Sequence, residues 1–150
     1  MQLRRYCQND LAQMAELFYQ TVHATCVGDY SPAQLSAWAT GEIDEDSWHA
    51  RYSASYTLIA LQEDKIIGFG NLDSNYLDML YVHKDHQRQG VATALCDALE
   101  KAAAGNVITV HASITAKPFF EQRGYHVISS QTVICRGVEM INYIMEKDLG

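Results

Sequence analysis

The sequence has little proline and no long hydrophobic run, and these two features limit the classes of protein to which it can belong. Only 2 of 150 residues are proline while 48% are hydrophobic, which excludes a disordered chain and favours one globular domain over residues 1–150. No apolar stretch approaches the roughly 20 residues needed to cross a membrane, and residues 1–10 carry no signal-peptide core. We therefore expect a soluble, cytoplasmic protein that does not associate with membranes.

Paired cysteines and positive charge are also lacking. The 4 cysteines (Cys7, Cys26, Cys96 and Cys135) are far apart and show no metal-ligand spacing, so we expect reduced, mostly buried thiols. His83 and His86 could touch one metal, but no third ligand is apparent, and we expect no metal site. The net charge of −7 argues against nucleic acid as a partner, because binding to its backbone requires clustered cations.

The first third of the chain carries helix-start signals. Residues 3–6 form a plausible short strand, and Asp10 then resembles an N-cap with Gln13 placed to close a capping box. A second start is signalled by Ser31 as the cap, Pro32 at the first helical position and Gln34 completing the box. Residues 44–52 predict a further turn or two of helix.

From residue 56 onward the pattern alternates between strands and helices. Short β-like runs at 56–61 and 66–72 flank a hairpin turn, and strands are predicted at 76–82 and 107–111. Residues 91–104 have helical spacing and end at Gly105, while Thr115 can cap a short helix that Gly124 ends. A closing hairpin is expected at 126–134 and 138–146. This order predicts a mixed α/β domain with a mostly antiparallel sheet flanked by helices.

The most informative segment is residues 87–92, Gln-Arg-Gln-Gly-Val-Ala, between the strand at 76–82 and the helix at 91–104. A strand, a short glycine-containing loop and a helix start form a phosphate-binding arrangement. The free N–H groups of the first helical turn and the helix dipole favour an anion there, and Gly90 leaves room for it. The loop therefore predicts a site for a phosphate-bearing ligand.

These residues resemble the GNAT acyltransferases, the Gcn5-related N-acetyltransferases. Residues 87–92 match the family's Gln/Arg-x-x-Gly-x-Gly/Ala loop, residues 77–82 resemble the strand before it, and residues 116–125 resemble its Ala-x-x-Phe-Tyr-x-x-x-Gly-Phe helix. Residues 30–39 and 112–120 resemble in particular the YafP-like bacterial branch of the family. The motifs are specific for the fold and the cofactor and give almost no information on the acceptor.

The resemblance implies a central mixed sheet that splays at the strand before the glycine loop, with acetyl-CoA as co-substrate in the opening. The strand backbone would meet the pantetheine, and the N–H groups of the loop would hold the pyrophosphate. The implied cofactor-binding residues are Leu80, Tyr81, Val82, Gln87, Arg88, Gln89, Gly90, Val91, Ala92, Thr93 and Ser113.

The chain departs from the family pattern at a position that matters for the chemistry. Many family members carry a tyrosine, which can protonate the leaving thiolate, where this chain has Phe120. A phenyl ring has no proton to give, so Tyr125 or Tyr81 would have to substitute, Ser113 would relay through water, or the thiolate would leave unassisted. Unassisted departure is tolerable because a free thiol has a pKa of about 8.5. Backbone N–H groups near Tyr81 are the expected oxyanion donors.

Asp78 is the candidate general base, because it is a carboxylate in an otherwise apolar strand. Alternation places it on the face of Tyr76, Leu80 and Val82 if no bulge interrupts, and burial there would raise its pKa. The alternative is a carboxylate at a strand edge, paired with a Lys or Arg. His111 is expected on the strand facing Asp78, where it would be either structural or able to titrate in a useful range.

In this fold the acceptor pocket is usually formed by the first helices, here residues 27–38. Tyr30 and Trp38 would supply an aromatic wall for a flat or cationic acceptor, with His111 as a further acceptor-side candidate. The alternative is that Trp38, at helical spacing, simply fills the core.

Two functions of different class remain open. The leading one is an N-acetyltransferase that moves acetyl from acetyl-CoA to a primary amine of a small molecule or peptide, by direct attack in a ternary complex. The alternative is a non-catalytic acetyl-CoA-binding sensor or partner module. The phenylalanine at position 120, which cannot donate a proton, is compatible with this alternative. The net charge argues against a toxin acting on transfer RNA, which also uses this fold. The chain is expected to be a monomer or a homodimer.

Overall fold

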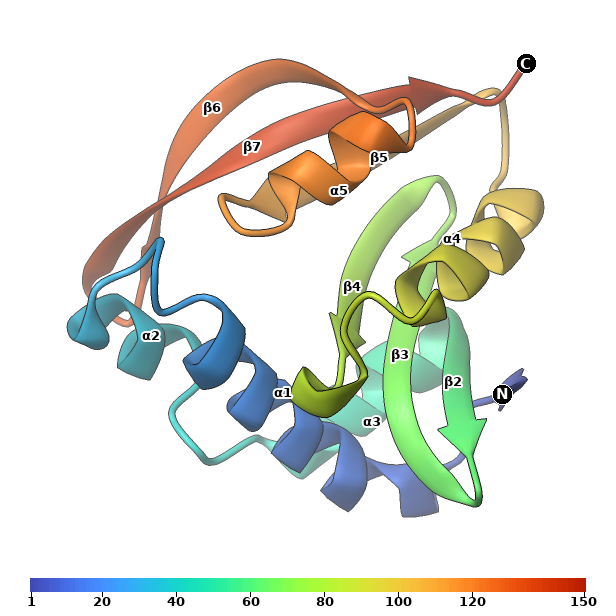
Figure 1. Cartoon of the computed structure of the whole chain (residues 1–150), viewed down its shortest axis with the longest axis horizontal. Helices are drawn as coiled ribbons and strands as arrows, with labels where there is room; N and C mark the ends of the chain where they lie inside the picture. Colours follow the sequence, from blue (N-terminus) through green and yellow to red (C-terminus); the bar gives the residue numbers. More distant parts are fainter.

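One seven-stranded sheet, with strand order β1-β2-β3-β4-β5-β7-β6, runs through the molecule (Figure 1). The computed structural model describes residues 1–150. Every neighbouring pair is antiparallel except β4 and β5, which are parallel, and this confirms the predicted mixed α/β class. The strands are β1 (Gln2–Arg5), β2 (Tyr56–Gln62), β3 (Lys65–Asp73), β4 (Tyr76–Val82), β5 (Val107–Ser113), β6 (His126–Cys135) and β7 (Val138–Asp148).

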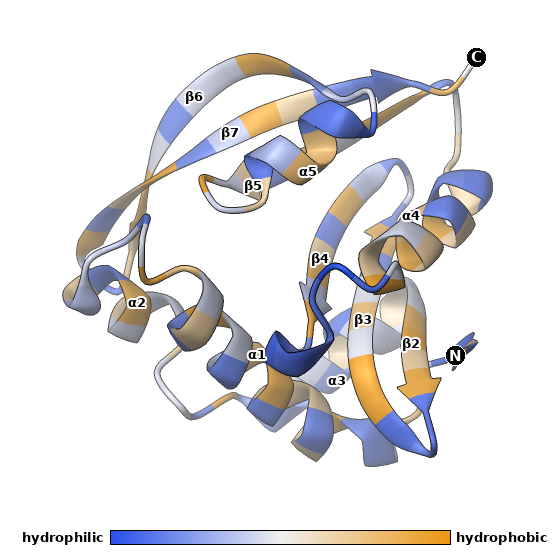
Figure 2. Ribbon diagram, in the orientation of Figure 1, coloured by the Kyte–Doolittle hydropathy of each residue, from blue (hydrophilic) through white to orange (hydrophobic).

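The helices cover both faces of the sheet. One cluster of buried side chains joins the sheet to α4 and α5, and a second joins its other face to α1, α2 and α3. Figure 2 shows apolar residues along α4 and the central strands, while the loop that leads into α4 is hydrophilic. None of the helices has the length and apolar character that a membrane span requires. The helices are α1 (Leu11–Thr25), α2 (Pro32–Trp38), α3 (Glu45–Ala54), α4 (Val91–Ala102) and α5 (Lys117–Gln122), with single 3-10 turns η1 (Gln8–Asp10) and η2 (Lys84–His86).

Two glycines on β3 allow α4 to lie directly on the sheet. A Cβ at Gly68 would stand 2.9 Å from Cγ1 of Val91, and one at Gly70 would stand 3.0 Å from Cδ1 of Leu99. Any side chain at these positions would push the helix away from the strand. The start of α4, and the loop before it, are therefore held against β3 and β4.

The two predicted capping boxes near the N-terminus have different outcomes. The box of α2 is confirmed, since Gln34 N–H donates to Ser31 Oγ at 3.2 Å and Ser31 N–H donates to Gln34 Oε1 at 2.8 Å. The box at Asp10 is wrong. The Asp10 carboxylate instead accepts two 2.8 Å hydrogen bonds from Arg4 and one from Cys7 N–H at 2.9 Å. Strand β1 brings Arg4 to this carboxylate, and the capping pattern does not take such a partner into account.

Two later helix boundaries also differ from their predictions. Helix α4 ends at Ala102, before the expected glycine, although Gly105 does adopt a positive φ of 84° in the turn that follows. Helix α5 is not capped by Thr115, whose hydroxyl donates to Asp29 at 2.7 Å. The turn into α5 is instead closed by Ser113 Oγ, which accepts from Ala116 N–H at 3.0 Å.

The sheet opens between β4 and β5. Their pairing is confined to Tyr76 with Thr109 and Leu77 with Val110, after which the strands diverge (Figure 1). Just beyond this point the β3–β4 register shifts between Asn71 and Leu72. This confirms the expected splay at the strand before the glycine loop, and it adds a bulge at Asp78 that alternation does not predict.

Candidate active site

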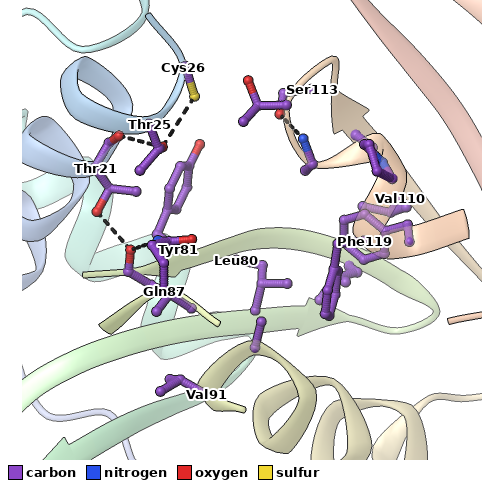
Figure 3. Close-up of a pocket in the computed structure, with 18 of the residues that line it drawn as sticks. Thr21, Thr25, Cys26, Leu80, Tyr81, Gln87, Val91, Val110, Ser113 and Phe119 are labelled. Carbon is purple, nitrogen blue, oxygen red and sulfur yellow. Dashed lines mark hydrogen bonds between the residues drawn. The ribbon is translucent and has the colours of Figure 1, made fainter. Parts of the chain in front are cut away.

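A cavity of about 810 Å³ occupies the opening between β4 and β5. Its walls come from β4, the loop into α4, β5, α5 and the C-terminal ends of α1 and α2. Figure 3 shows Thr21, Thr25 and Cys26 gathered on one wall, with Ser113, Val110 and Phe119 on the other. The volume suits a ligand considerably larger than a metabolite fragment.

The start of α4 presents unpaired backbone donors to this cavity. Gly90, the N-cap, has a φ of 84° and supplies no capping side chain. The first backbone bond of the helix runs from Ala94 N–H to Gly90 O at 3.0 Å, and the N–H groups of Val91, Ala92 and Thr93 have no acceptor in the chain. Unsatisfied donors at a helix N-terminus favour an anionic ligand.

The rest of the loop divides into side chains that hold its shape and side chains that face the cavity. Gln87 Nε2 donates to Val82 O at 2.7 Å, and the same carbonyl accepts from Thr21 Oγ1 at 3.0 Å, so the end of β4 is fixed from two sides (Figure 3). Arg88 is exposed, has a φ of 60° and lines the cavity. Gln89 does not line it and contacts His86 Nδ1 at 3.2 Å instead.

One backbone edge of β4 has no neighbouring strand beyond Leu77. The other edge pairs with β3, while Leu80, Tyr81 and Val82 all line the cavity. An extended ligand could therefore hydrogen-bond to this free edge as an added strand would. Ser113, across the cavity on β5, lines it too, but its Oγ already accepts from the turn into α5.

Tyr81 is the tyrosine that lines the cavity. Its ring packs edge-on against Phe18 at 4.9 Å between centroids, and Trp38 Nε1 donates to its phenolic oxygen at 3.2 Å. Because the oxygen accepts that bond and the phenol has no protein acceptor, its own proton is free for a ligand. Burial raises the pKa of Tyr81 well above its ordinary value and outweighs the bond from Trp38, so the phenol stays protonated.

Asp78 lies on the other face of the strand from the one that simple alternation predicts. The bulge turns it toward α3, where Arg51 donates to both of its oxygens at 2.7 and 2.9 Å and Asn71 Nδ2 donates at 3.0 Å. Leu80 belongs to the cluster under α4, on the opposite face. The carboxylate lines the cavity, but it matches the alternative expectation of a carboxylate paired with an arginine.

Two candidate tyrosines lie outside the cavity lining. The Tyr125 hydroxyl donates to Glu100 Oε2 at 2.9 Å within the core under α4, so it is not available as a proton donor at the site. The Tyr30 hydroxyl donates to Ile141 O at 2.8 Å and accepts from Ile114 N–H at 2.9 Å. Tyr30 therefore fastens the turn between α1 and α2 to the sheet, and of the two aromatic residues predicted to line the acceptor side only Trp38 lines the cavity.

His111 and Phe120 complete the set of predicted positions. His111 is exposed at the cavity, with the Tyr76 ring 5.1 Å away and Gln131 Nε2 at 3.4 Å from its Nδ1. Phe120 lines the cavity and is only 2% exposed. Phe120, the position at which the resemblance implies a hydroxyl, therefore contributes no polar side-chain atom to the cavity.

The polar lining contributed by the end of α1 was not predicted from the sequence. Thr21 and Thr25 stand four residues apart, and Cys26 follows them. The signal was present, since these threonines continue the helical stripe of Met14 and Phe18 where its residues change from apolar to polar. Burial raises the pKa of the Cys26 thiol above its ordinary value of 9.0, against weaker opposing bonds from neighbouring hydroxyls, so it is a thiol and not a thiolate at neutral pH.

The chain is similar in sequence to a known family and to a curated protein. The family described as "Acetyltransferase (GNAT) domain" matches residues 26–147. An uncharacterized N-acetyltransferase YafP of Escherichia coli K12 is 39% identical over 145 residues, covering 97% of this chain and 94% of that protein.

Solved structures agree with the sequence matches. A GCN5-related N-acetyltransferase from Rhodopseudomonas palustris superposes with a TM-score of 0.95 at 39% identity, covering 99% of this chain and 95% of that one. The PaiA N-acetyltransferase of Thermoplasma acidophilum, solved in complex with coenzyme A, superposes with a TM-score of 0.75 at 17% identity, covering 98% of both chains. The latter likeness shows the fold alone.

Proposed function

The chain belongs to the GNAT family of acetyltransferases, and from this premise we propose that it transfers acetyl from acetyl-CoA to a primary amine of a small molecule or peptide. The observation that carries the proposal is the meeting, in one cavity, of three unpaired N–H groups at the start of α4 and the free backbone edge of β4. The first suits a pyrophosphate and the second suits an extended pantetheine arm.

In this proposal the donor lies along the free edge of β4. The N–H groups of Val91, Ala92 and Thr93 hold the pyrophosphate, and the exposed Arg88 adds a positive charge beside it. Leu80, Tyr81 and Val82 meet the pantetheine and thioester through their backbone. The complex of a protein of the same fold with coenzyme A supports this choice of ligand.

The proposed reaction is direct attack in a ternary complex. The neutral amine nitrogen forms a bond to the thioester carbon, and backbone N–H groups near Tyr81 stabilise the oxyanion. As the carbon–sulfur bond breaks, the sulfur takes the phenolic proton of Tyr81, and the phenolate then takes the surplus proton of the attacking nitrogen. The products are an amide and coenzyme A, and the tyrosine ends as it began. Tyr81 thereby supplies the proton that Phe120 lacks.

The protonation state of Cys26 is an argument for direct attack and against an acetyl-enzyme intermediate. It lines the cavity, but a nucleophilic cysteine has to be a thiolate, and burial holds this thiol in its protonated form. We assign Cys26, Thr21 and Thr25, together with Trp38 and His111, to the acceptor part of the cavity. The lining carboxylate, Asp78, is already neutralised by Arg51.

The experiment is a two-stage measurement on the intact chain. Calorimetry first measures acetyl-CoA binding. Release of free thiol is then followed in the presence of a panel of small primary amines and of peptides with a free amino terminus. We expect binding and amine-dependent thiol release. Binding without release for any amine would favour the non-catalytic module, and absence of binding by the folded protein would contradict the proposal altogether.

A further inference from the structure

No unpaired carboxylate lines the cavity. Asp78 is the one acidic residue of the lining, and Arg51 on α3 donates to both of its oxygens, from Nε at 2.7 Å and from Nη2 at 2.9 Å. The basic lining residues, Arg88, His86 and His111, carry either a positive charge or none. The charged side chains of the lining therefore offer no free negative charge to a ligand.

The other ionisable side chains of the lining are neutral. Burial raises the pKa of the Cys26 thiol and that of the Tyr81 phenol, so neither is an anion at neutral pH. Asp29, which is close to Cys26 in the chain, lies outside the lining, and its carboxylate accepts a hydrogen bond from Thr115 Oγ1 at 2.7 Å. An ammonium group inside the cavity would have no counter-charge, and burial of an unpaired charge is costly.

The hydroxyl groups on the α1 wall are arranged to accept hydrogen bonds from a neutral ligand. Thr21 Oγ1 donates to Val82 O at 3.0 Å, and Thr25 Oγ1 donates to Thr21 O at 2.7 Å (Figure 3). Both hydroxyl protons are engaged within the protein, while lone pairs of both oxygens remain for the N–H groups of an amine. The rings of Trp38 and Tyr81, which also line the cavity, suit a flat apolar ligand.

The basicity of an amine decides whether it can enter such a cavity ready to react, because only a neutral nitrogen has a lone pair for attack. An alkylamine as basic as lysine, with a pKa of about 10.4, is neutral in about one molecule of 2,500 at pH 7. An aromatic amine is neutral at that pH, since its ring delocalises the lone pair. We propose that the acceptor is a weakly basic aromatic amine, and that Arg51 determines this specificity by neutralising Asp78. This inference rests on the proposed function and narrows its acceptor.

The acceptor class is tested on the native chain with aniline and cyclohexylamine, which have the same number of non-hydrogen atoms. Thiol release from acetyl-CoA gives kcat/KM for each amine, and at pH 7 we expect aniline to be preferred at least about 100-fold. Between pH 7 and 9 the preference should fall about tenfold per pH unit, as the neutral fraction of cyclohexylamine rises. The ratio of the two values cancels any titration of the enzyme itself.

Three outcomes of this comparison count against a proposal. Equal use of the two amines at pH 7, or thiol release with alkylamines alone, would overturn the inference and leave the proposed function intact. A preference that does not change with pH would show that amine basicity is not what the cavity selects. Absence of release with every aromatic and aliphatic amine would contradict the proposed function, and the inference with it.

The role of Arg51 is tested by Arg51→Gln, which leaves the Asp78 carboxylate at the cavity without its cation. The preference at pH 7 should shift by about tenfold toward cyclohexylamine, because its ammonium group gains a charged partner. Arg4→Gln is the matched control. It also removes an arginine that donates to both oxygens of a carboxylate, at 2.8 Å each, but that carboxylate, Asp10, lies outside the lining. An unchanged preference in folded Arg51→Gln, or equal shifts in both variants, would overturn this role, and the comparison on the native chain stands independently of either variant.

Discussion

The two parts of the cavity are assembled in different ways. The proposed donor side, Leu80–Val82 and residues 87–93, lies within the single segment 80–93 and presents mostly backbone groups. The proposed acceptor side brings Thr21, Thr25, Cys26 and Trp38 from the first two helices together with His111 on β5, and it presents side chains. The donor side thus depends on local conformation and the acceptor side on tertiary packing.

In this proposed division, the donor side can stay the same while the acceptor side changes. Backbone donors demand little of the side chains around them beyond the glycine at position 90, so this part of the chain leaves a recognisable motif. Side chains drawn from distant segments can change without altering the fold. The difference also predicts which substitutions abolish binding of the donor and which change only the chemistry.

The largest effect is expected on the donor side from Gly90→Glu. A carboxylate beside the three free N–H groups competes with the pyrophosphate, so acetyl-CoA affinity should fall at least about 100-fold, or about 2.7 kcal/mol. Gly105→Glu is a matched control, because both glycines have a φ of 84° and open space at Cβ. Both variants should lose roughly 1–2 kcal/mol of stability from the left-handed backbone. Equal affinity in the two variants, measured by calorimetry, would refute the donor assignment.

The second-largest effect is expected on kcat, from substitution of Tyr81. Tyr81→Phe should lower kcat by about 100-fold and leave acetyl-CoA affinity unchanged, because it removes a proton donor. Trp38→Phe, which removes the N–H that orients the phenol together with part of the ring, should lower kcat by less. In the double variant, Trp38→Phe should add no further loss. Additive losses in steady-state kinetics would assign Trp38 a role that does not pass through Tyr81.

Asp78→Asn should act on stability more than on mechanism. It removes the charge that binds Arg51 at the bulge, and we expect a loss of about 1–3 kcal/mol in the free energy of unfolding. Turnover should change by the same factor at every pH. Asp73→Asn, an exposed carboxylate on β3 with no hydrogen-bond partner, is the control. A loss of turnover concentrated below neutral pH would restore Asp78 as the base for a protonated amine.

The smallest effect is expected from Glu100→Gln, behind the donor side. Glu100 lies on α4 and accepts from Arg123 at 2.6 Å, Lys147 at 2.8 Å and Tyr125 at 2.9 Å. Burial opposes its ionisation, but these three bonds outweigh burial and hold its pKa below the ordinary value of 4.5. We expect a loss of about 1–2 kcal/mol at neutral pH.

The pH dependence of that loss has a definite sign. Because the folded pKa of Glu100 is depressed, its contribution to stability is complete above the unfolded value and disappears as pH falls through the folded value. Urea denaturation should therefore show wild type and Glu100→Gln converging below pH 4.5. A difference that stays constant or widens on acidification would show that the carboxylate charge is not what fixes α4.

The fold was largely predictable from the sequence because its signals are local. The alternation in β4, the capping box of Ser31 and Gln34 and the glycine before α4 each depend on neighbours within a few residues. Asp10 shows where prediction from local signals fails. Its carboxylate, which stands in a capping position, accepts hydrogen bonds from Arg4 on strand β1 and does not cap the helix.

The cavity lining was predictable for residues 80–82 and for most of residues 87–93, and only partly for the other predicted site residues. Tyr125 and Tyr30 carried plausible hydroxyls, but tertiary packing engaged both in structural bonds away from the cavity. The bulge that turns Asp78 toward Arg51 depends on how two strands pair, which the alternation within one strand does not encode. The Trp38–Tyr81 bond joins residues 43 positions apart, and no spacing rule identifies it.

The most direct test is an amide chemical-shift titration of the isotopically labelled chain with acetyl-CoA. If the donor lies along β4 and the start of α4, the largest changes should fall on the amides of Leu80–Val82 and residues 87–93. Those of Thr21, Thr25 and Trp38 should move less until an acceptor is added. Largest changes on the acceptor side, or none at the start of α4, would contradict the proposed division of the cavity.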